Sequence, residues 1–169
     1  MLEVKVNDAD IRKAAAEGED AFIAVFVAAI RDAIGGEITT ENIGSLSADQ
    51  ITLLAWAHLH EEVMEGGYVQ LIHNGFGAFI FKNPFAVAMR NWGLTTLYSH
   101  IRRTKKFYDK YHAEIERDMN DEDFMALYEQ MPEFDDQDDD FIVSEEAWTQ
   151  EIATYVDEHL ADFVTITQG

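Results

Sequence analysis

The densest group of chemically capable side chains is a run of carboxylates from Asp135 to Asp140, with five aspartates in six positions. Carboxylates bind hard cations, act as acids and bases in catalysis, or stand in for nucleic-acid phosphates. A calcium loop that begins at Asp135 would place Asp139 at position five and Glu146 at position twelve. Position six is Asp140, where the loop needs glycine for a sharp turn, so a specific calcium site is not predicted. Acid–base catalysis needs a sheltered carboxylate, whereas a run this polar is predicted to be solvated.

A second group has the residue types of a metal site, and its members are His58, His60, Glu61 and Glu62. The zinc motif His-Glu-x-x-His would need a second histidine where Met64 stands. His58 and Glu62 share one face of a helix, but two ligands do not complete a site. A metal-dependent protein or enzyme that uses His58, Glu62 or the acidic run stays an alternative. The prediction is that the protein is not an enzyme and holds no metal and no cofactor.

The carboxylates belong to a larger acidic segment. Residues 113–169 hold 19 of the 33 acidic residues but only one of the 12 Lys and Arg residues, and therefore −18 of the net charge of −21. A small domain needs a net charge of only about 2–8 for solubility. Eighteen charges correspond to about 31 Å of duplex DNA at one charge per about 1.7 Å. The excess predicts an acidic face in 113–169 that binds a basic partner. A structural or regulatory module whose charge serves solubility alone is a further alternative.

Ten carboxylates are the predicted contacts for Lys and Arg side chains of that partner, each in place of a phosphate. They are Asp135, Asp136, Asp138, Asp139, Asp140, Glu145, Glu146, Glu151, Asp157 and Glu158. The expected partner is a basic DNA-binding protein, because the acidic field attracts cations and repels nucleic acid itself. The longest apolar run, Ala21 to Ile30, is about half the roughly 20 residues of a membrane span, so no membrane partner is expected. The missing cysteines and the acidic start of the chain favour the cytoplasm.

Helical spacing of apolar residues dominates the chain and predicts the elements that position these groups. Expected helices lie near residues 8–17, 22–34, 48–65, 68–74, 85–91, 95–115 and 121–131. Ser47 and Gln50 form a capping box, and Asp121 can cap a later helix. Residues 133–140 are predicted to be an acidic loop, and Ser144 is predicted to cap the last helix. The prediction is an all-α class: one domain over residues 1–169, a bundle of about seven helices without strands.

The only basic cluster lies in the helix predicted near residues 95–115. Its members are Arg102, Arg103, Lys105, Lys106 and Lys110, with Phe107 and Tyr108 between them and Tyr111 directly after Lys110. At helical spacing the aromatics are predicted to be core residues. The cations are predicted to face acids of the same chain or of a second copy rather than nucleic acid.

Two segments resemble a known family. Gly66-Gly67-Tyr68-Val69-Gln70, followed by Asn74, resembles the Asn-Gly-Gly-Phe-x-Gln-x-x-x-Asn signature of the DNA-mimic protein family of the DMP-nineteen type. Phe134-Asp135-Asp136-Gln137 and the helix of residues 152–163 resemble the closing segment of that family. Glu65 departs from the signature, since the family usually has Asn there.

The resemblance covers about residues 46–164 and implies an all-α fold. It also implies an acidic homodimer that imitates the phosphates of duplex DNA and occupies the DNA-binding face of a transcription factor. The signature residues Gly67, Tyr68, Gln70 and Asn74 are predicted to be structural: a helix stop, a core aromatic and two amides that cap backbone groups.

Overall fold

Local sequence signals set most of the helix boundaries in the computed structural model, which describes residues 2–168. That part of the chain contains eight α-helices and one two-stranded sheet, which confirms the all-α class. The helices are α1 (Asp8–Glu17), α2 (Glu19–Ile34), α3 (Ala48–His73), α4 (Gly77–Phe81), α5 (Phe85–Asn91), α6 (Thr95–Ile115), α7 (Asp121–Gln130) and α8 (Glu133–Glu158). None of them is both long and apolar enough to cross a membrane.

The chain divides into two compact units. The first unit combines residues 2–54 with 149–168, and the second unit is the continuous stretch 55–148. Helices α3 and α8 contribute residues to both units. One domain over residues 1–169 stays a prediction, and its end residues Met1 and Gly169 lie outside the described residues.

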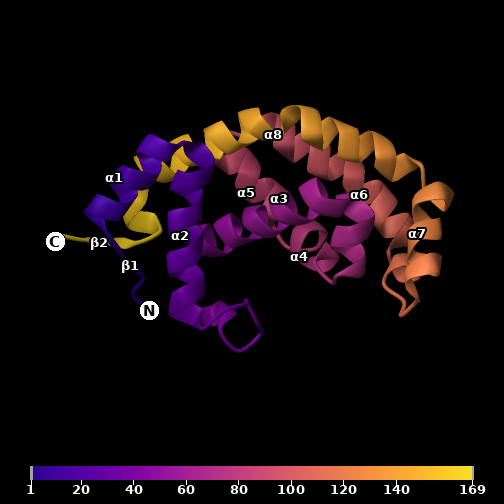
Figure 1. Cartoon of the computed structure of the whole chain (residues 1–169), viewed down its shortest axis with the longest axis horizontal. Coiled ribbons are helices and arrows are strands. Elements are labelled where there is room, and N and C mark those ends of the chain that lie inside the picture. Colours follow the sequence, from indigo (N-terminus) through magenta and orange to yellow (C-terminus); the bar gives the residue numbers. More distant parts are fainter. Residues whose placement is uncertain (1, 169) are drawn as a thin grey trace. The chain divides into compact units, whose positions relative to one another are not determined.

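In the first unit, α1 and α2 lie beside a small sheet that joins the two ends of the chain (Figure 1). Strand β1 (Lys5–Asn7) pairs in parallel with β2 (Thr165–Thr167). Just before this ladder, the Thr165 N–H donates to the Val4 carbonyl over 2.7 Å. The expectation of no strands was therefore wrong. Each strand has only three residues, too few to show an alternating pattern in the sequence.

Helix ends in the first unit follow the sequence closely. The Asn7 side chain accepts the Ala9 N–H at the start of α1. Gly35 ends α2 in the left-handed region at φ 84°, where glycine has no steric penalty. The capping box is confirmed: the Ser47 hydroxyl accepts the Gln50 N–H, and the Gln50 side chain accepts the Ser47 N–H over 2.9 Å.

The second unit is built around large aromatic side chains. Tyr68, Tyr108 and Phe141 are almost completely buried there, as is Ile80 of the short helix α4. A Cβ atom at Gly77 would lie 2.5 Å from the ring of Tyr108, so α4 approaches α6 closely because Gly77 has no side chain.

Two predictions about the start of the last helix were wrong: the acidic loop at residues 133–140 and the cap at Ser144. Residues 133–140 form the first turns of α8, and Ser144 lies inside that helix. Phe134 and Phe141, seven residues apart, are both buried, so the helical conformation places two aromatic rings in the core. Acidic residues in the first turn also interact favourably with the positive end of the helix dipole. The cap of α7 is Asn120, whose side chain accepts the Asp123 N–H, rather than Asp121.

Candidate functional site

The outer surface of α8 carries most of the ten predicted carboxylates. Seven of them are exposed: Asp135, Asp136, Asp139 and Glu146 in the second unit, and Glu151, Asp157 and Glu158 in the first. Their exposure follows from helical geometry, because Phe134, Phe141 and Trp148 turn another face of α8 toward the core. The structure thus places these seven where a partner can reach them.

The other three predicted carboxylates bond within the second unit. Asp138 accepts the backbone N–H of Tyr68 over 2.8 Å. Asp140 binds the His100 ring over 2.7 Å and Arg103 over 3.3 Å. Glu145 hydrogen-bonds to the ring of His60 over 2.8 Å. These three side chains attach the first half of α8 to α3 and α6.

Asp138 occupies a gap that exists because Gly67 has no side chain. A Cβ atom at Gly67 would lie 2.3 Å from Asp138 Oδ2, and the φ of Gly67 is 78°. At this kink in α3, Asp138 of α8 caps the Tyr68 N–H. Burial raises the pKa of Asp138 to about 7, although the Tyr68 hydrogen bond opposes the shift and Asp135 and Asp139 support it. The prediction that the whole aspartate run is solvated was wrong at this residue.

A buried chain of hydrogen bonds continues from the same signature segment. The Tyr68 hydroxyl lies 2.6 Å from His100 Nε2, and His100 Nδ1 lies 2.7 Å from Asp140 Oδ2. Burial lowers the pKa of His100, against the effect of Asp140, and raises the pKa of Tyr68. A neutral imidazole with its proton on Nδ1 satisfies both contacts, since Nδ1–H donates to the carboxylate and Nε2 accepts from the hydroxyl. Tyr68 is a core aromatic, as predicted.

The two signature amides bind a side chain rather than the backbone. Gln70 Nε2 and Asn74 Nδ2 donate to the same oxygen of Glu62, over 2.7 Å and 3.1 Å. The prediction that they cap backbone groups was therefore wrong. The Gln70 side chain lies across Gly66, where a Cβ atom would be 2.0 Å from its Oε1. Both signature glycines thus leave room for a polar side chain, and the signature describes packing inside the second unit.

The residues of the metal alternative have structural surroundings. His58 is buried and stacks on Phe76 with ring centroids 4.4 Å apart. Glu62 is bound by the two amides. Within residues 2–168, no group of three or more His, Asp or Glu side chains is placed to hold a metal ion.

Sequence reasoning missed several residues that position α8. Gln137 accepts the Thr104 hydroxyl over 2.8 Å, and the Trp148 indole N–H donates to Thr96 over 2.8 Å. Glu133 accepts the Tyr111 hydroxyl, which lowers the pKa of this carboxylate. The polar types of these residues give no sign of their partners, which lie 22 to 52 positions away.

The basic cluster of α6 is partly paired with acids of the same chain, as expected. Arg103, Lys105 and Lys110 form ion pairs with Asp140, Asp109 and Glu133. Tyr108 is buried, while Phe107 and Tyr111 are half-buried. The expectation of core aromatics is thus confirmed fully only for Tyr108.

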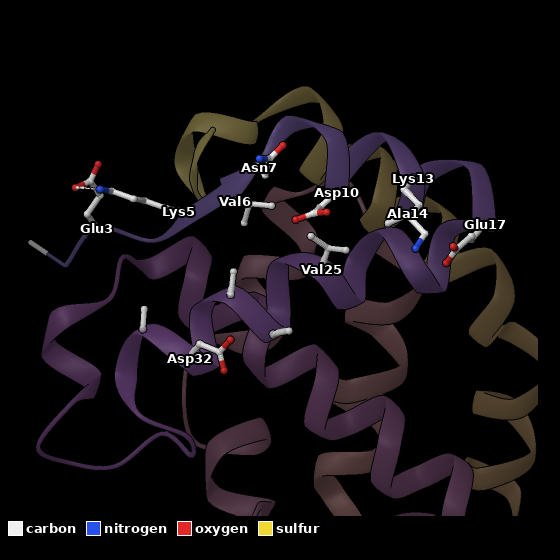
Figure 2. A pocket seen from close by; sticks show the side chains of 13 residues that line it. Glu3, Lys5, Val6, Asn7, Asp10, Lys13, Ala14, Glu17, Val25 and Asp32 are labelled. Atoms are coloured by element: carbon white, nitrogen blue, oxygen red, sulfur yellow. Dashed lines mark ion pairs between the residues drawn. The ribbon is translucent and has the colours of Figure 1, made fainter. Parts of the chain in front are cut away.

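The first unit also has an open groove of about 710 Å³ between α1, α2 and β1. Figure 2 shows Asp10, Lys13 and Glu17 along one side, Asp32 on the other, and the Glu3–Lys5 ion pair at one end. Apolar side chains such as Ala14 and Val25 also line the groove. The groove contains none of the ten predicted carboxylates and is separate from the candidate site.

Comparison with known proteins adds a family to this geometry. The model of the DMP19-like protein family matches residues 44–159. A protein of Neisseria meningitidis serogroup B strain MC58, named DNA mimic protein DMP19, is 33% identical over 130 residues, which span 76% of this chain and 79% of that protein. The match includes the Gly66-Gly67 kink, the amides that bind Glu62 and the whole of α8. The chain therefore belongs to the DMP19-like protein family.

Proposed function

We propose that this protein is a non-enzymatic DNA mimic. Its acidic surface binds the DNA-binding face of a basic protein, such as a transcription factor, and excludes DNA from that face. The exposed carboxylates of α8 carry the proposal, because they are accessible to solvent and lie in a segment with a single basic residue. The name of the Neisseria relative supports the same role.

The spacing of the carboxylates supports imitation of DNA. Asp135 and Asp139 are four residues apart, about 6 Å along the helix axis at about 1.5 Å per residue. Phosphates of one DNA strand advance by about 3.4 Å along the duplex axis. The two charge spacings are of the same order, so Lys and Arg residues arranged for DNA can approach several carboxylates at once.

Hydrogen bonding divides the predicted contacts into two roles. The exposed carboxylates are the proposed partner contacts, whereas Asp138, Asp140 and Glu145 act mainly by holding α8 in place. Exposed acids of α7 extend the candidate surface in the second unit, and they are Asp121, Glu122, Asp123 and Glu129. A homodimer, which the family resemblance implies, belongs to the same proposal and is tested by sedimentation at several protein concentrations.

The experiment is capture from a cell lysate at low salt, with the full chain immobilised. We expect DNA-binding proteins to be recovered, and we expect added duplex DNA or added salt to release them. The variant Asp135→Asn/Asp136→Asn/Asp139→Asn removes three exposed charges without breaking a described hydrogen bond, and it should capture much less.

The matched control removes three exposed charges from the groove of the first unit, with Asp10→Asn, Glu17→Gln and Asp32→Asn. Equal capture by the control and the wild type locates binding on α8. If both triple variants capture as much as the wild type, the charge serves solubility alone. Recovered proteins that resist release by duplex DNA would argue against mimicry.

A further inference from the structure

The outer face of α8 is not purely acidic, because two aliphatic residues interrupt the carboxylates. Ile142 is 50% exposed and Val143 is 84% exposed, the highest value among the large hydrophobic residues of the described chain. Both lie in the second unit, in the interior of a continuous helix. Their exposure therefore follows from their position on a regular helix rather than on a loop.

Carboxylates flank this aliphatic pair on both sides. Asp139 lies three and four residues before the pair, and Glu146 lies four and three residues after it. Residues three and four apart on a helix are surface neighbours. Each aliphatic side chain thus has an exposed carboxylate one turn away in both directions, and neither Asp139 nor Glu146 has a described ion-pair partner.

A third apolar residue extends the pair toward α3. On each of the two helices, three residues at i, i+4 and i+7 form a stripe that faces the other helix. The stripes are His60, Met64 and Gly67 on α3, and Asp138, Ile142 and Glu145 on α8. Contacts join both ends of the stripes, since His60 binds Glu145 and Gly67 lies against Asp138. Met64, 42% exposed, and Ile142 are the middle members of the two stripes. We group them with Val143 as the apolar patch of this surface.

We propose that this patch, Met64, Ile142 and Val143, binds an apolar side chain at the centre of the basic face of the partner. The inference rests on the proposed function and adds to it. DNA-binding proteins read thymine through apolar contacts with its methyl group, between side chains that bind phosphates. Aliphatic methyl groups between carboxylates present the same combination. The patch therefore imitates a base edge, whereas the surrounding acids imitate the backbone.

Charge distinguishes this occupant from a second copy of the chain. Two patches that met face to face would bring Asp139, Glu146 and Glu65 of both copies together around a small apolar contact. Like charges at such a contact are unfavourable, and the apolar area of three side chains is small. A partner with an apolar centre and a basic rim complements both parts of the surface.

The test uses two synthetic helical peptides as probes. Both carry Lys and Arg along one face, and they differ only at one central position of that face, which is leucine in one and glutamine in the other. Their affinities for the full-length protein are measured by fluorescence anisotropy at low salt. The variants are Ile142→Ser/Val143→Ser and the control Val87→Ser, which replaces an exposed valine of α5, one turn before Arg90.

We expect the leucine peptide to bind the wild type more tightly than the glutamine peptide. The double variant should bind the leucine peptide about tenfold more weakly, as for loss of one central apolar contact, and should bind the glutamine peptide unchanged. The control should match the wild type with both peptides. Circular dichroism of each variant verifies that the helices are retained.

Three results would overturn the inference. The first is a wild type that binds the two peptides equally, and the second is a double variant that loses both peptides to the same extent. The third is sedimentation that shows the wild type self-associating and the double variant monomeric, which would assign the patch to a second copy. Failure of both peptides to bind the wild type would overturn the proposed function as well.

Discussion

Asp138 should make the stability of this protein depend on pH in a direction opposite to that of an ordinary surface aspartate. Burial raises its pKa from the ordinary value of 3.8 to about 7. The folded state therefore keeps a proton that the unfolded chain releases between these two values. Because the unfolded state binds fewer protons in this window, the free energy of unfolding falls as pH rises from about 4 to about 7.

The size of the effect follows from the shift. Each pKa unit corresponds to about 1.4 kcal/mol, so a rise from 3.8 to about 7 corresponds to about 4 kcal/mol. The free energy of unfolding begins to fall near the pKa of Asp138 in the unfolded chain, and the fall is complete slightly above its pKa in the folded state. At higher pH, Asp138 adds no further pH dependence to the stability. The cause is desolvation of the ionised carboxylate beside Gly67, only partly offset by the Tyr68 N–H.

The variant Asp138→Asn isolates this contribution. Asparagine keeps a carbonyl oxygen to accept the Tyr68 N–H and has no charge at any pH. We expect the variant and the wild type to differ least at the acidic end of the range. Toward pH 8 the variant should gain up to about 4 kcal/mol relative to the wild type. The measurement is chemical denaturation of both proteins at a series of pH values.

The control is Asp139→Asn, which removes the neighbouring exposed carboxylate. Its free energy of unfolding should follow that of the wild type closely at every pH, because exposed charges contribute less than about 1 kcal/mol to stability. Parallel curves for Asp138→Asn and the wild type over the whole range would refute the reasoning, since they would show that Asp138 ionises equally in the folded and unfolded states.

Three further predictions concern the signature segment and the acidic charge. Gly67→Ala should lower the free energy of unfolding, measured by urea denaturation, by about 2–4 kcal/mol, because the φ of Gly67 is 78° and its Cβ would lie 2.3 Å from Asp138. The control Gly93→Ala, at φ 96° and with no atom within 4 Å, should lower it by about 1 kcal/mol. Equal losses for the two variants would contradict the contact with Asp138. Glu62→Ala leaves the Gln70 and Asn74 amides without their acceptor and should lower the free energy of unfolding by about 1–3 kcal/mol. Glu62→Gln keeps an acceptor and should lower it less. The reverse order would contradict the shared hydrogen bond. Added salt should raise the melting temperature by screening repulsion among the carboxylates, and a melting temperature that is independent of salt would mean that these charges are too dispersed to repel.

Local signals were sufficient for the helical class and for many boundaries. The Asn7 cap, the glycine stop at Gly35 and the Ser47–Gln50 capping box act within a few residues, so neighbouring residues contain all the information. The charge of residues 113–169 is likewise a property of the sequence. On an amphipathic helix, a carboxylate between buried aromatic positions is exposed unless another element covers it. The signature segment also identified the family without any coordinates.

Contacts between distant residues decided the rest. Residues 133–140 have the composition of a loop, and they are helical because Phe134 and Phe141 are buried in a core that other helices complete. Asp138 and Asp139 are adjacent and identical in type, yet one caps Tyr68 and the other is exposed. The difference arises from the kink at Gly67, about seventy residues away in the sequence. Sequence patterns specify how a segment can fold, but the solvation of each carboxylate depends on which distant backbone groups the tertiary structure brings beside it.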